Sequence, residues 1–357
     1  MLTLDSQICS NNHLSFDEAE LVIEITKFCP QYCLFCSSNA GPSQNYYMRL
    51  SQIIDIMNEA ESLKFRSIHL SGGEPLSHPE IGSILDILIK KNFKKVIYTC
   101  GLVNKSKKIS SLPEGLINKI SRIRNCVVRF NFQTLNEENF EIITQRRNSF
   151  RFALKSIQLC LDYGIQTEVH IVPTLLNLND LEKTISFLLN IGVKKVKILR
   201  FIPQGRGKQN QVIVDPSESS EKFYEILLSI IKAFPPSLVE IGSAFSCLGN
   251  ANNSCTAGIK KFAITPENIL FPCVAFKSTL GIPLDKNSLQ EVIQRYDFVI
   301  SLKEIIQNKC QICVFKEICK EICPMQVLLC KQFQIPNNEQ LVKVQKRLEN
   351  QDCVNVY

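Results

Sequence analysis

The stretch 21-LVIEITKFCPQYCLFC-36 decides the fold, because a β-rich run leads directly into three cysteines. Residues 21–26 predict a strand, and Cys29, Cys33 and Cys36 follow it with C-x3-C-x2-C spacing. Three thiolates on one short loop can hold three irons of a 4Fe–4S cube and leave the fourth iron without a protein ligand. The alternative is a zinc site completed by a distant residue. Zinc prefers four ligands, often in paired C-x2-C units, and no second pair lies nearby in the sequence.

Working outward, hydrophobic periodicity predicts six repeats of a strand followed by a helix. The predicted strands are residues 21–26, 67–71, 96–99, 127–132, 167–172 and 193–199. The predicted helices are a first one capped by Ser51, then residues 81–89, 116–123, 149–163 and 181–189, and a sixth at about 216–234. Such alternation implies a parallel sheet with right-handed crossovers, here a partial (β/α)6 TIM-like barrel of the α/β class. In barrels of this kind the loops after the strands carry the chemistry, so the cysteines lie on the functional face.

Composition excludes several classes of protein. The chain has 357 residues, of which 45% are hydrophobic and 21% charged, as in ordinary globular domains. The net charge of +7 is not gathered into blocks, which argues against a nucleic-acid partner. No apolar run is long enough to span a membrane and no signal peptide begins the chain, so we expect a cytoplasmic protein. Thiols stay reduced there, and clustering among the 16 cysteines therefore indicates metal.

The cysteine distribution and the composition divide the chain into three predicted parts. Residues 1–210 form the barrel, residues 211–240 a helical linker, and residues 241–357 a small irregular cysteine-rich domain stabilised by metal clusters. The segment QGRGKQNQ at 204–211 is rich in Gly and Gln and is interpreted as a surface loop. Its Arg206 is a candidate for binding an anionic substrate or a peptide carbonyl, and the segment is equally a candidate hinge.

A second motif lies one strand after the cysteines. Residues 72–75 read Gly-Gly-Glu-Pro. Glycines let the backbone approach a ligand closely, and Glu74 can accept hydrogen bonds from an ammonium group. Together with CPQYCLFC at 29–36, where Phe35 precedes the third cysteine, this motif resembles the radical S-adenosylmethionine superfamily.

The resemblance implies a 4Fe–4S cluster whose open iron is chelated by S-adenosylmethionine. Reduction by an external donor such as flavodoxin or ferredoxin then gives a 5′-deoxyadenosyl radical, which abstracts hydrogen from the substrate. By the family pattern, the motif glycines and Glu74 hold the cofactor amino group. The residues expected to contact the cofactor are Phe35, Gly72, Gly73, Glu74, Pro75, Thr99, Asn131, Gln133, Arg146 and Arg147.

Some of these positions depart from the family pattern. Asn131 and Gln133 stand where the family has a Ser-x-Asp pair that holds the ribose. Cys100 stands where the family usually has Asn after Thr99, and it is a candidate hydrogen-atom donor to a substrate radical, with ordinary core packing as the alternative. One of Arg146 and Arg147 is expected to pair with the cofactor carboxylate, unless both are solvated surface residues.

The C-terminal cysteines carry a second resemblance, to the SPASM extension of the same superfamily. The array C-x2-C-x5-C-x3-C begins at Cys310, and Cys255 and Cys273 frame Asn268, which stands at a glycine position of the pattern. Asn is the next-best residue for a left-handed backbone. The resemblance implies two auxiliary 4Fe–4S clusters, one held by Cys247, Cys255, Cys273 and Cys323, the other by Cys310, Cys313, Cys319 and either Cys330 or Cys353. We prefer Cys330, because Cys353 lies close to the C-terminus. A zinc-ribbon tail and a single-cluster variant are the alternatives.

The sequence therefore predicts an enzyme of the radical S-adenosylmethionine class that modifies a peptide or protein side chain. The first predicted strand begins at Leu21, so there is no room before it for the recognition domain of many peptide maturases, and a leader peptide would need a separate carrier protein. This keeps a small-molecule substrate open, for a dehydrogenase or a cofactor-biosynthesis enzyme. A non-catalytic zinc or iron–sulfur protein is the alternative of another class.

Overall fold

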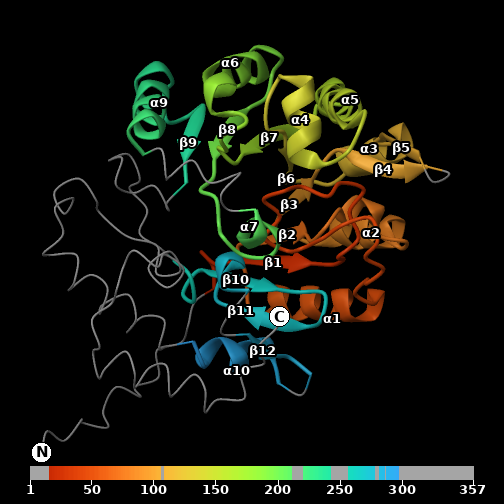
Figure 1. The fold of residues 1–357 in the computed structure, drawn as a ribbon. Coiled ribbons are helices and arrows are strands. Elements are labelled where there is room, and N and C mark those ends of the chain that lie inside the picture. The colour runs from red at the N-terminus through yellow and green to blue at the C-terminus, as the bar shows by residue number, and fades with distance from the viewer. Residues whose placement is uncertain are drawn as a thin grey trace, which may run out of the picture.

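Six parallel strands form the centre of the fold, in the order that the sequence predicts (Figure 1). The structure, a computed structural model, describes residues 16–105, 108–210, 220–242, 256–277, 281–285 and 287–296. The central strands are β1 (Glu20–Glu24), β2 (Ser67–Ser71), β3 (Lys94–Thr99), β6 (Cys126–Asn131), β7 (Gln166–Ile171) and β8 (Lys195–Ile198). All five adjacent pairs are parallel. The predicted α/β fold with a largely parallel sheet, the partial barrel, is confirmed.

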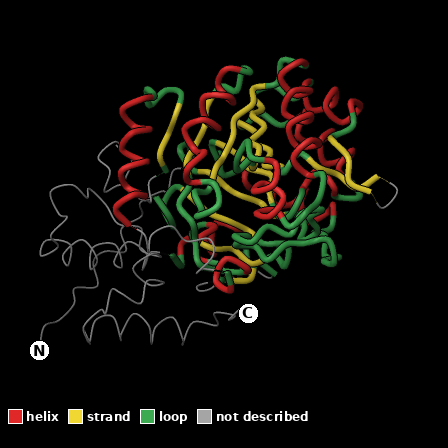
Figure 2. The backbone as a smooth tube through the Cα atoms, turned by 45° about the horizontal axis from the view of Figure 1, so that its top comes forward, coloured by secondary structure: helices red, strands yellow, loops and turns green. Residues whose placement is uncertain are grey.

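Helices cover one face of this sheet (Figures 1 and 2). They are α1 (Leu50–Ser62), α2 (Ile81–Lys90), α3 (Glu114–Ser121), α4 (Glu137–Thr144), α5 (Ser149–Asp162), α6 (Leu181–Asn190) and α9 (Ser220–Ala233). Short 3₁₀ turns, η1 (Pro75–Ser77) and η2 (Leu178–Asp180), precede α2 and α6. No helix within the described ranges has the length and apolarity that a membrane span requires.

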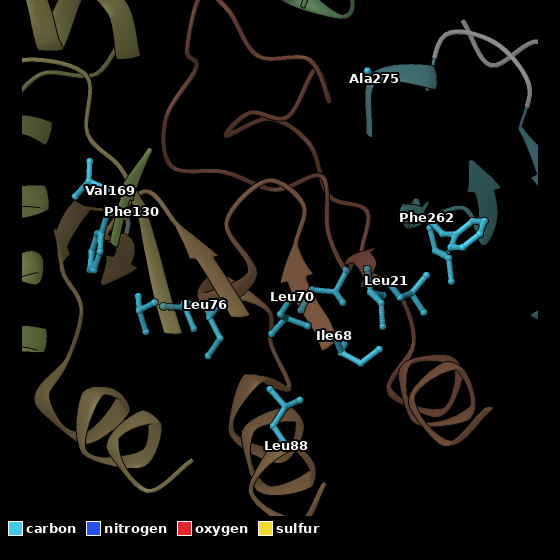
Figure 3. Close-up of a cluster of buried hydrophobic side chains, with 14 of the residues drawn as sticks. Leu21, Ile68, Leu70, Leu76, Leu88, Phe130, Val169, Phe262 and Ala275 are labelled. Atoms are coloured by element: carbon cyan, nitrogen blue, oxygen red, sulfur yellow. The ribbon is translucent and has the colours of Figure 1, made fainter. Parts of the chain in front are cut away.

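The main hydrophobic core lies between the strands and these helices. Leu21, Ile68 and Leu70 project from β1 and β2 toward Leu88 of α2 (Figure 3). Strand side chains alternate between the two faces of a sheet, so the residues between these apolar positions point to the opposite, inner face. On β7 those inner residues are polar and include His170, and the inner face of β6 carries Arg129.

The sheet continues on both sides of the six central strands. Strand β9 (Val239–Ile241) pairs with β8 in parallel. On the other side β10 (Lys261–Ile264) pairs in parallel with β1, followed by antiparallel β11 (Ile269–Phe271) and β12 (Ile282–Pro283). The proposed domain boundaries stay a prediction, but strands from the predicted linker and tail hydrogen-bond into the barrel sheet.

The turn between β10 and β11 bears out one sequence argument. Asn268 has a φ of 63°, and its backbone N–H donates to the Thr265 carbonyl at 2.9 Å. A left-handed backbone is what the pattern's glycine would supply. Asn takes that conformation at lower cost than most residues, which explains how the turn survives the substitution.

Several local predictions were wrong. Helix α1 is capped by Arg49, not Ser51, because the Gln52 side chain accepts the Arg49 N–H at 3.3 Å. The hairpin of β4 (Leu102–Lys105) and β5 (Lys108–Ser111) and helix α4 were not predicted. Helix α10 (Leu289–Gln294), which follows β12, was not predicted either. The largest error concerns the supposed surface loop at 204–211, which contains α7 (Arg206–Gln209) with Arg206 only 2% exposed.

Candidate functional site

The three cysteines of the predicted cluster lie on the loop that leaves the carboxyl end of β1. Cys29 is buried, while Cys33 and Cys36 are partly exposed. Burial raises the pKa of the Cys33 thiol well above its usual value, and the neighbouring Cys29 and Cys36 thiols raise it further. Burial likewise raises the pKa of Cys36. The Cys29 and Cys36 thiols therefore lie near the Cys33 thiol, as ligands of one cluster must.

The loop has no regular structure of its own, and its backbone is fixed by neighbouring elements. The N–H groups of Tyr32 and Leu34 donate at 2.9 Å to the carbonyls of Thr144 and Ile143, at the end of α4. The Cys29 N–H donates to the Gly41 carbonyl at 3.1 Å, which closes the loop on itself. Helix α4 was not predicted from the sequence, and it supplies two of the loop's anchors.

Arg206 of α7 is the central side chain of this support. Its guanidinium donates to the Cys33 carbonyl at 3.0 Å, the Ala40 carbonyl at 2.6 Å and Asn39 Oδ1 at 3.1 Å. Its Cζ lies 3.6 Å from the centre of the Tyr32 ring. A planar fork of donors suits several carbonyls at once, so Arg206 holds the cysteine loop in place and is not available for a substrate.

Glycines let the α7 segment approach the cysteine loop this closely. A Cβ on Gly205 would come within 2.6 Å of the Cys36 carbonyl oxygen, and Gly205 has a φ of 57°. Phe35 packs with Phe201 and Val172 in a small apolar cluster at the same contact. Sequence analysis missed this role of Arg206. Its position between two glycines was the available signal.

The Gly-Gly-Glu-Pro motif follows β2 directly and packs on the cysteine loop. A Cβ on Gly73 would lie 2.1 Å from the Phe28 carbonyl oxygen, and one on Gly72 2.5 Å from that of Thr26. The glycines thus serve first to let two segments of the chain touch. Pro75 begins η1 behind them. A contact between these residues and a cofactor amino group stays a prediction.

Glu74 is fully buried, and its carboxylate links the ends of β2 and β3. It accepts hydrogen bonds from the Cys100 N–H at 2.7 Å, the Leu76 N–H at 3.0 Å and the Thr99 hydroxyl at 3.0 Å. Burial raises the pKa of Glu74 to about 7, although these hydrogen bonds lower it. The carboxylate is thus held by its own chain, and any contact with a ligand ammonium would add to this set.

Cys100 lies against the predicted cluster cysteines. It is 6% exposed and packs with Cys29, Ala40 and Leu102. Burial raises the pKa of its thiol well above the usual value, and a hydrogen bond with the Cys29 thiol raises it further. The structure brings Cys100 to the site, while its role as a hydrogen-atom donor stays a prediction.

The remaining predicted cofactor contacts differ in their surroundings. Gln133 is buried, its Oε1 accepts the Val172 N–H at 2.9 Å, and its Nε2 has no partner among the described residues. Asn131 is exposed at the carboxyl end of β6. Arg146 is half-buried and Arg147 exposed, just beyond α4. For both arginines, a contact with the cofactor carboxylate and a plain surface position stay open as interpretations.

One predicted auxiliary ligand lies in the described part of the chain. Cys273 begins the 3₁₀ turn η5 (Val274–Phe276), and the carbonyl of Val274 accepts a 2.8 Å hydrogen bond from Gln204. The other predicted auxiliary ligands lie outside the described residues: Cys247, Cys255, Cys310, Cys313, Cys319, Cys323, Cys330 and the alternative Cys353.

The donor set fits a cluster better than a single ion. Within the described residues, no three His, Cys, Asp or Glu side chains are placed to hold one metal ion. Yet three thiols lie on the loop after β1, where the Cys33 thiol donates to Gln31 Oε1 at 3.4 Å, and the buried amide nitrogens of Gln31 and of Gln133, on the segment after β6, have no partner among the described residues. An all-thiol set favours iron–sulfur ligation, and orphaned buried amides indicate that a polar ligand completes the site.

Comparison with known proteins agrees with this geometry. The Radical SAM superfamily matches residues 23–188. GTP 3′,8-cyclase of Clostridium perfringens is 23% identical over 297 residues, which cover 77% of this chain and 88% of that protein. The subtilosin biosynthesis protein AlbA of Bacillus subtilis is 23% identical over 262 residues, covering 72% of this chain and 55% of AlbA.

Among solved structures, SuiB of Streptococcus suis bound to S-adenosylmethionine aligns with a TM-score of 0.66 at 16% identity, covering 89% of this chain and 75% of SuiB. At this identity the likeness establishes the fold. The superfamily match spans β1 to α6, which includes the cysteine loop and the Gly-Gly-Glu-Pro motif. The region from β1 to α6 therefore matches the Radical SAM superfamily, and the protein is a radical S-adenosylmethionine enzyme that works with a 4Fe–4S cluster.

Proposed function

We propose that this enzyme modifies a side chain of a peptide or protein by abstracting a hydrogen atom. The convergence of the Cys29, Cys33 and Cys36 thiols on a braced loop carries the proposal. When bound there, the cluster and S-adenosylmethionine supply a 5′-deoxyadenosyl radical. Our assignment of the three cysteines as its ligands rests on their position after β1 and on their mutual proximity.

The chain's own residues orient and shield this chemistry. Arg206 fixes the backbone of the cysteine loop through the Cys33 and Ala40 carbonyls, so the chain itself holds the segment that carries the thiols. Glu74 ties the Thr99–Cys100 turn to the motif that follows β2. Gln133 Nε2, at the end of β6, is a buried donor without a partner in the described part of the chain, and it is suited to a ribose hydroxyl or an adenine nitrogen. Preorganised groups of this kind lower the cost of binding and orientation.

A peptide substrate is favoured by relatives of this chain. AlbA is named for the biosynthesis of the bacteriocin subtilosin, and SuiB has been solved with the precursor peptide SuiA. A small-molecule substrate is the second candidate. GTP 3′,8-cyclase, whose name specifies a nucleotide, aligns over 88% of its own length, whereas the chain spans 55% of AlbA.

We further propose two auxiliary 4Fe–4S clusters. Cys273 is the predicted ligand whose surroundings can be described. It lies at the end of β11, beside Gln204, whose Nε2 donates to Val274. Three clusters predict about twelve irons and twelve sulfides per chain after anaerobic reconstitution. A few zinc ions without sulfide would instead support the non-catalytic alternative.

The decisive experiment is S-adenosylmethionine cleavage by the reconstituted protein with dithionite. We expect 5′-deoxyadenosine from the wild type and none from Cys33→Ala, because a cluster ligand is lost. Cys126→Ala is the matched control, since Cys126 lies at the opposite end of the strands. Cys313→Ala should keep part of the cleavage. Full cleavage by Cys33→Ala would refute the assignment.

Substrate class is tested separately. Peptides encoded beside the gene, and GTP, are incubated with the reduced enzyme and S-adenosylmethionine and analysed by mass spectrometry. Loss of hydrogen or a new cross-link in a peptide supports the first candidate. Turnover of the nucleotide alone supports the second.

A further inference from the structure

The inner face of β6 to β9 carries a charged layer that the radical chemistry does not explain. We define the interior charged layer as Arg129, Glu168, His170, Lys195, Lys197 and Glu240. Neighbours in this set are register partners on adjacent strands. Arg129 pairs with Glu168, Glu168 with Lys195, His170 with Lys197, and Lys197 with Glu240. The layer therefore lines one continuous patch of the barrel interior.

The layer is not electrically balanced. Arg129 donates to Glu168 Oε2 at 2.8 Å and forms one closed pair. Lys195 and Lys197 both bind the single carboxylate of Glu240, Lys195 at 3.4 Å. Three cations thus face two carboxylates within the layer, and one positive charge has no counterpart there. Side-chain exposure of 32% for Lys195, 27% for Lys197 and 35% for Glu240 leaves this end of the layer open to a ligand.

Two buried histidines, His170 of the layer and His69 next to it, each have one ring nitrogen without a hydrogen-bond partner among the described residues. His170 Nε2 and His69 Nδ1 have none in the described structure, and the residues are 5% and 3% exposed. Both rings contact Tyr98, with centroids 5.5 and 5.9 Å away. Burial and nearby cations, Arg129 foremost among them, hold the pKa of His170 well below its usual value, so the ring is neutral. A buried unpaired ring nitrogen is costly and calls for an explanation.

We infer that the interior charged layer binds a carboxylate of the substrate, with Lys197 and His170 as its main contacts. The inference rests on the proposed function, because it takes the barrel interior as the place where substrate is held. A carboxylate supplies one negative charge, which matches the single uncompensated cation. Phosphate at neutral pH carries about 1.5 to 2 charges and fits less well. The carboxylate comes from an acidic side chain or from a peptide C-terminus.

The chain contains four histidines, which makes the site directly observable. Full-length protein labelled with ¹³C-histidine gives one imidazole signal per residue, and His170→Gln assigns the relevant one. The probes are N-acetylglutamate α-amide, which carries the carboxylate, and its neutral isostere N-acetylglutamine amide. Acetylalanine, which mimics a free C-terminus, and inorganic phosphate complete the set. We expect a saturable shift of His170 with one or both carboxylate probes. His78, which binds the Met48 carbonyl, serves as the internal reference.

Two variants test the charge argument in opposite directions. Lys197→Met leaves two cations facing the two carboxylates of the layer and should weaken carboxylate binding about fivefold. Glu240→Gln removes the internal competitor for both lysines and should tighten binding by a similar factor, about fivefold. A merely structural layer gives no reason for such a gain. Lys155→Met, on the outer helix α5, is the matched control and should leave the affinity unchanged.

The outcomes separate this inference from the proposed function. An equal shift with the neutral amide, a shift with phosphate alone, or no shift of His170 overturns it, as does weaker binding by Glu240→Gln. The comparison of the glutamate and alanine probes tells side-chain from terminal carboxylates. The titration needs no S-adenosylmethionine cleavage. Binding without 5′-deoxyadenosine formation would therefore refute the proposed function alone.

Discussion

Two buried charged residues of opposite sign support the functional edge of the barrel, Arg206 over the cysteine loop and Glu74 beneath the motif after β2. Both bind uncharged groups of the chain: Arg206 donates to two carbonyls and an amide, and Glu74 accepts from two N–H groups and a hydroxyl. They differ in how the burial of charge can be relieved. Glu74 takes up a proton near neutrality, whereas a guanidinium cannot release one in a protein. The cysteine loop thus has a pH-independent brace, and the motif after β2 a pH-dependent one.

The largest effect on stability is expected from replacing Arg206. Arg206→Met should lower the free energy of unfolding by about 3 to 5 kcal/mol, because a buried hydrogen-bonded charge is lost and its acceptors stay buried. It should also reduce iron incorporation, since the Cys33 and Ala40 carbonyls lose the guanidinium that holds them. Urea denaturation of the apoprotein and iron analysis after reconstitution measure the two effects. Exposed Arg122→Met should change stability by less than about 0.5 kcal/mol. Equal behaviour of the two variants would remove the assigned role.

A smaller effect is expected from Glu74, whose titration should make the folding stability depend on pH. Its folded pKa of about 7 lies above the ordinary 4.5, so the folded state keeps a proton that the unfolded state releases. Stability should therefore fall as pH rises from about 4.5 to 7, by about 3 kcal/mol from this group. Glu74→Gln does not titrate. The stability of the wild type relative to this variant should thus decline between pH 5 and 8. A constant difference in unfolding free energy across that range would contradict the shift.

The smallest effect on stability is expected at Asn268, in the turn between β10 and β11, because no buried charge is involved there. Asn268→Ala should cost about 1 kcal/mol, because Ala lacks the short polar side chain that makes the left-handed backbone tolerable for Asn. Asn268→Gly restores the residue that this conformation favours and should lie within a few tenths of a kcal/mol of the wild type. Thermal unfolding resolves the two. A cost for Gly as large as that for Ala would assign the role of Asn268 to its side-chain contact with Asp285 instead.

The sequence predicted the six central strands well because each carries a strong local signal. Buried β-rich runs alternate with helices of clear periodicity, and their register follows from the apolar face. Helix α4 escaped prediction. It is short, and its capping Asn136 was not recognised as a helix start. Segment 204–211 was misread because Gly and Gln indicate exposed loops by composition alone, whereas here glycines permit close packing.

In the candidate site too, local sequence features could be predicted and long-range contacts could not. Cysteine spacing and the Gly-Gly-Glu-Pro motif are local features, and they are sufficient to indicate the superfamily. The sequence predicted that Cys100 lies at the same edge of the sheet as Cys29, but not that the two residues are in contact. The contacts of Arg206 with the loop that holds Cys33 join residues 173 positions apart, and no local pattern announces such a pair.

The sequence by itself determined the strand order, the metal-binding chemistry and the edge of the sheet where it lies, because these depend on residue type and short spacing. Only the tertiary structure decided which charges are buried and what they hold. Arg206 became a brace, Glu74 a proton-binding link, and the layer from Arg129 to Glu240 an unbalanced patch inside the barrel. The physical reason is that the energy of a charge depends on its solvent exposure and its neighbours, and both are properties of the folded chain.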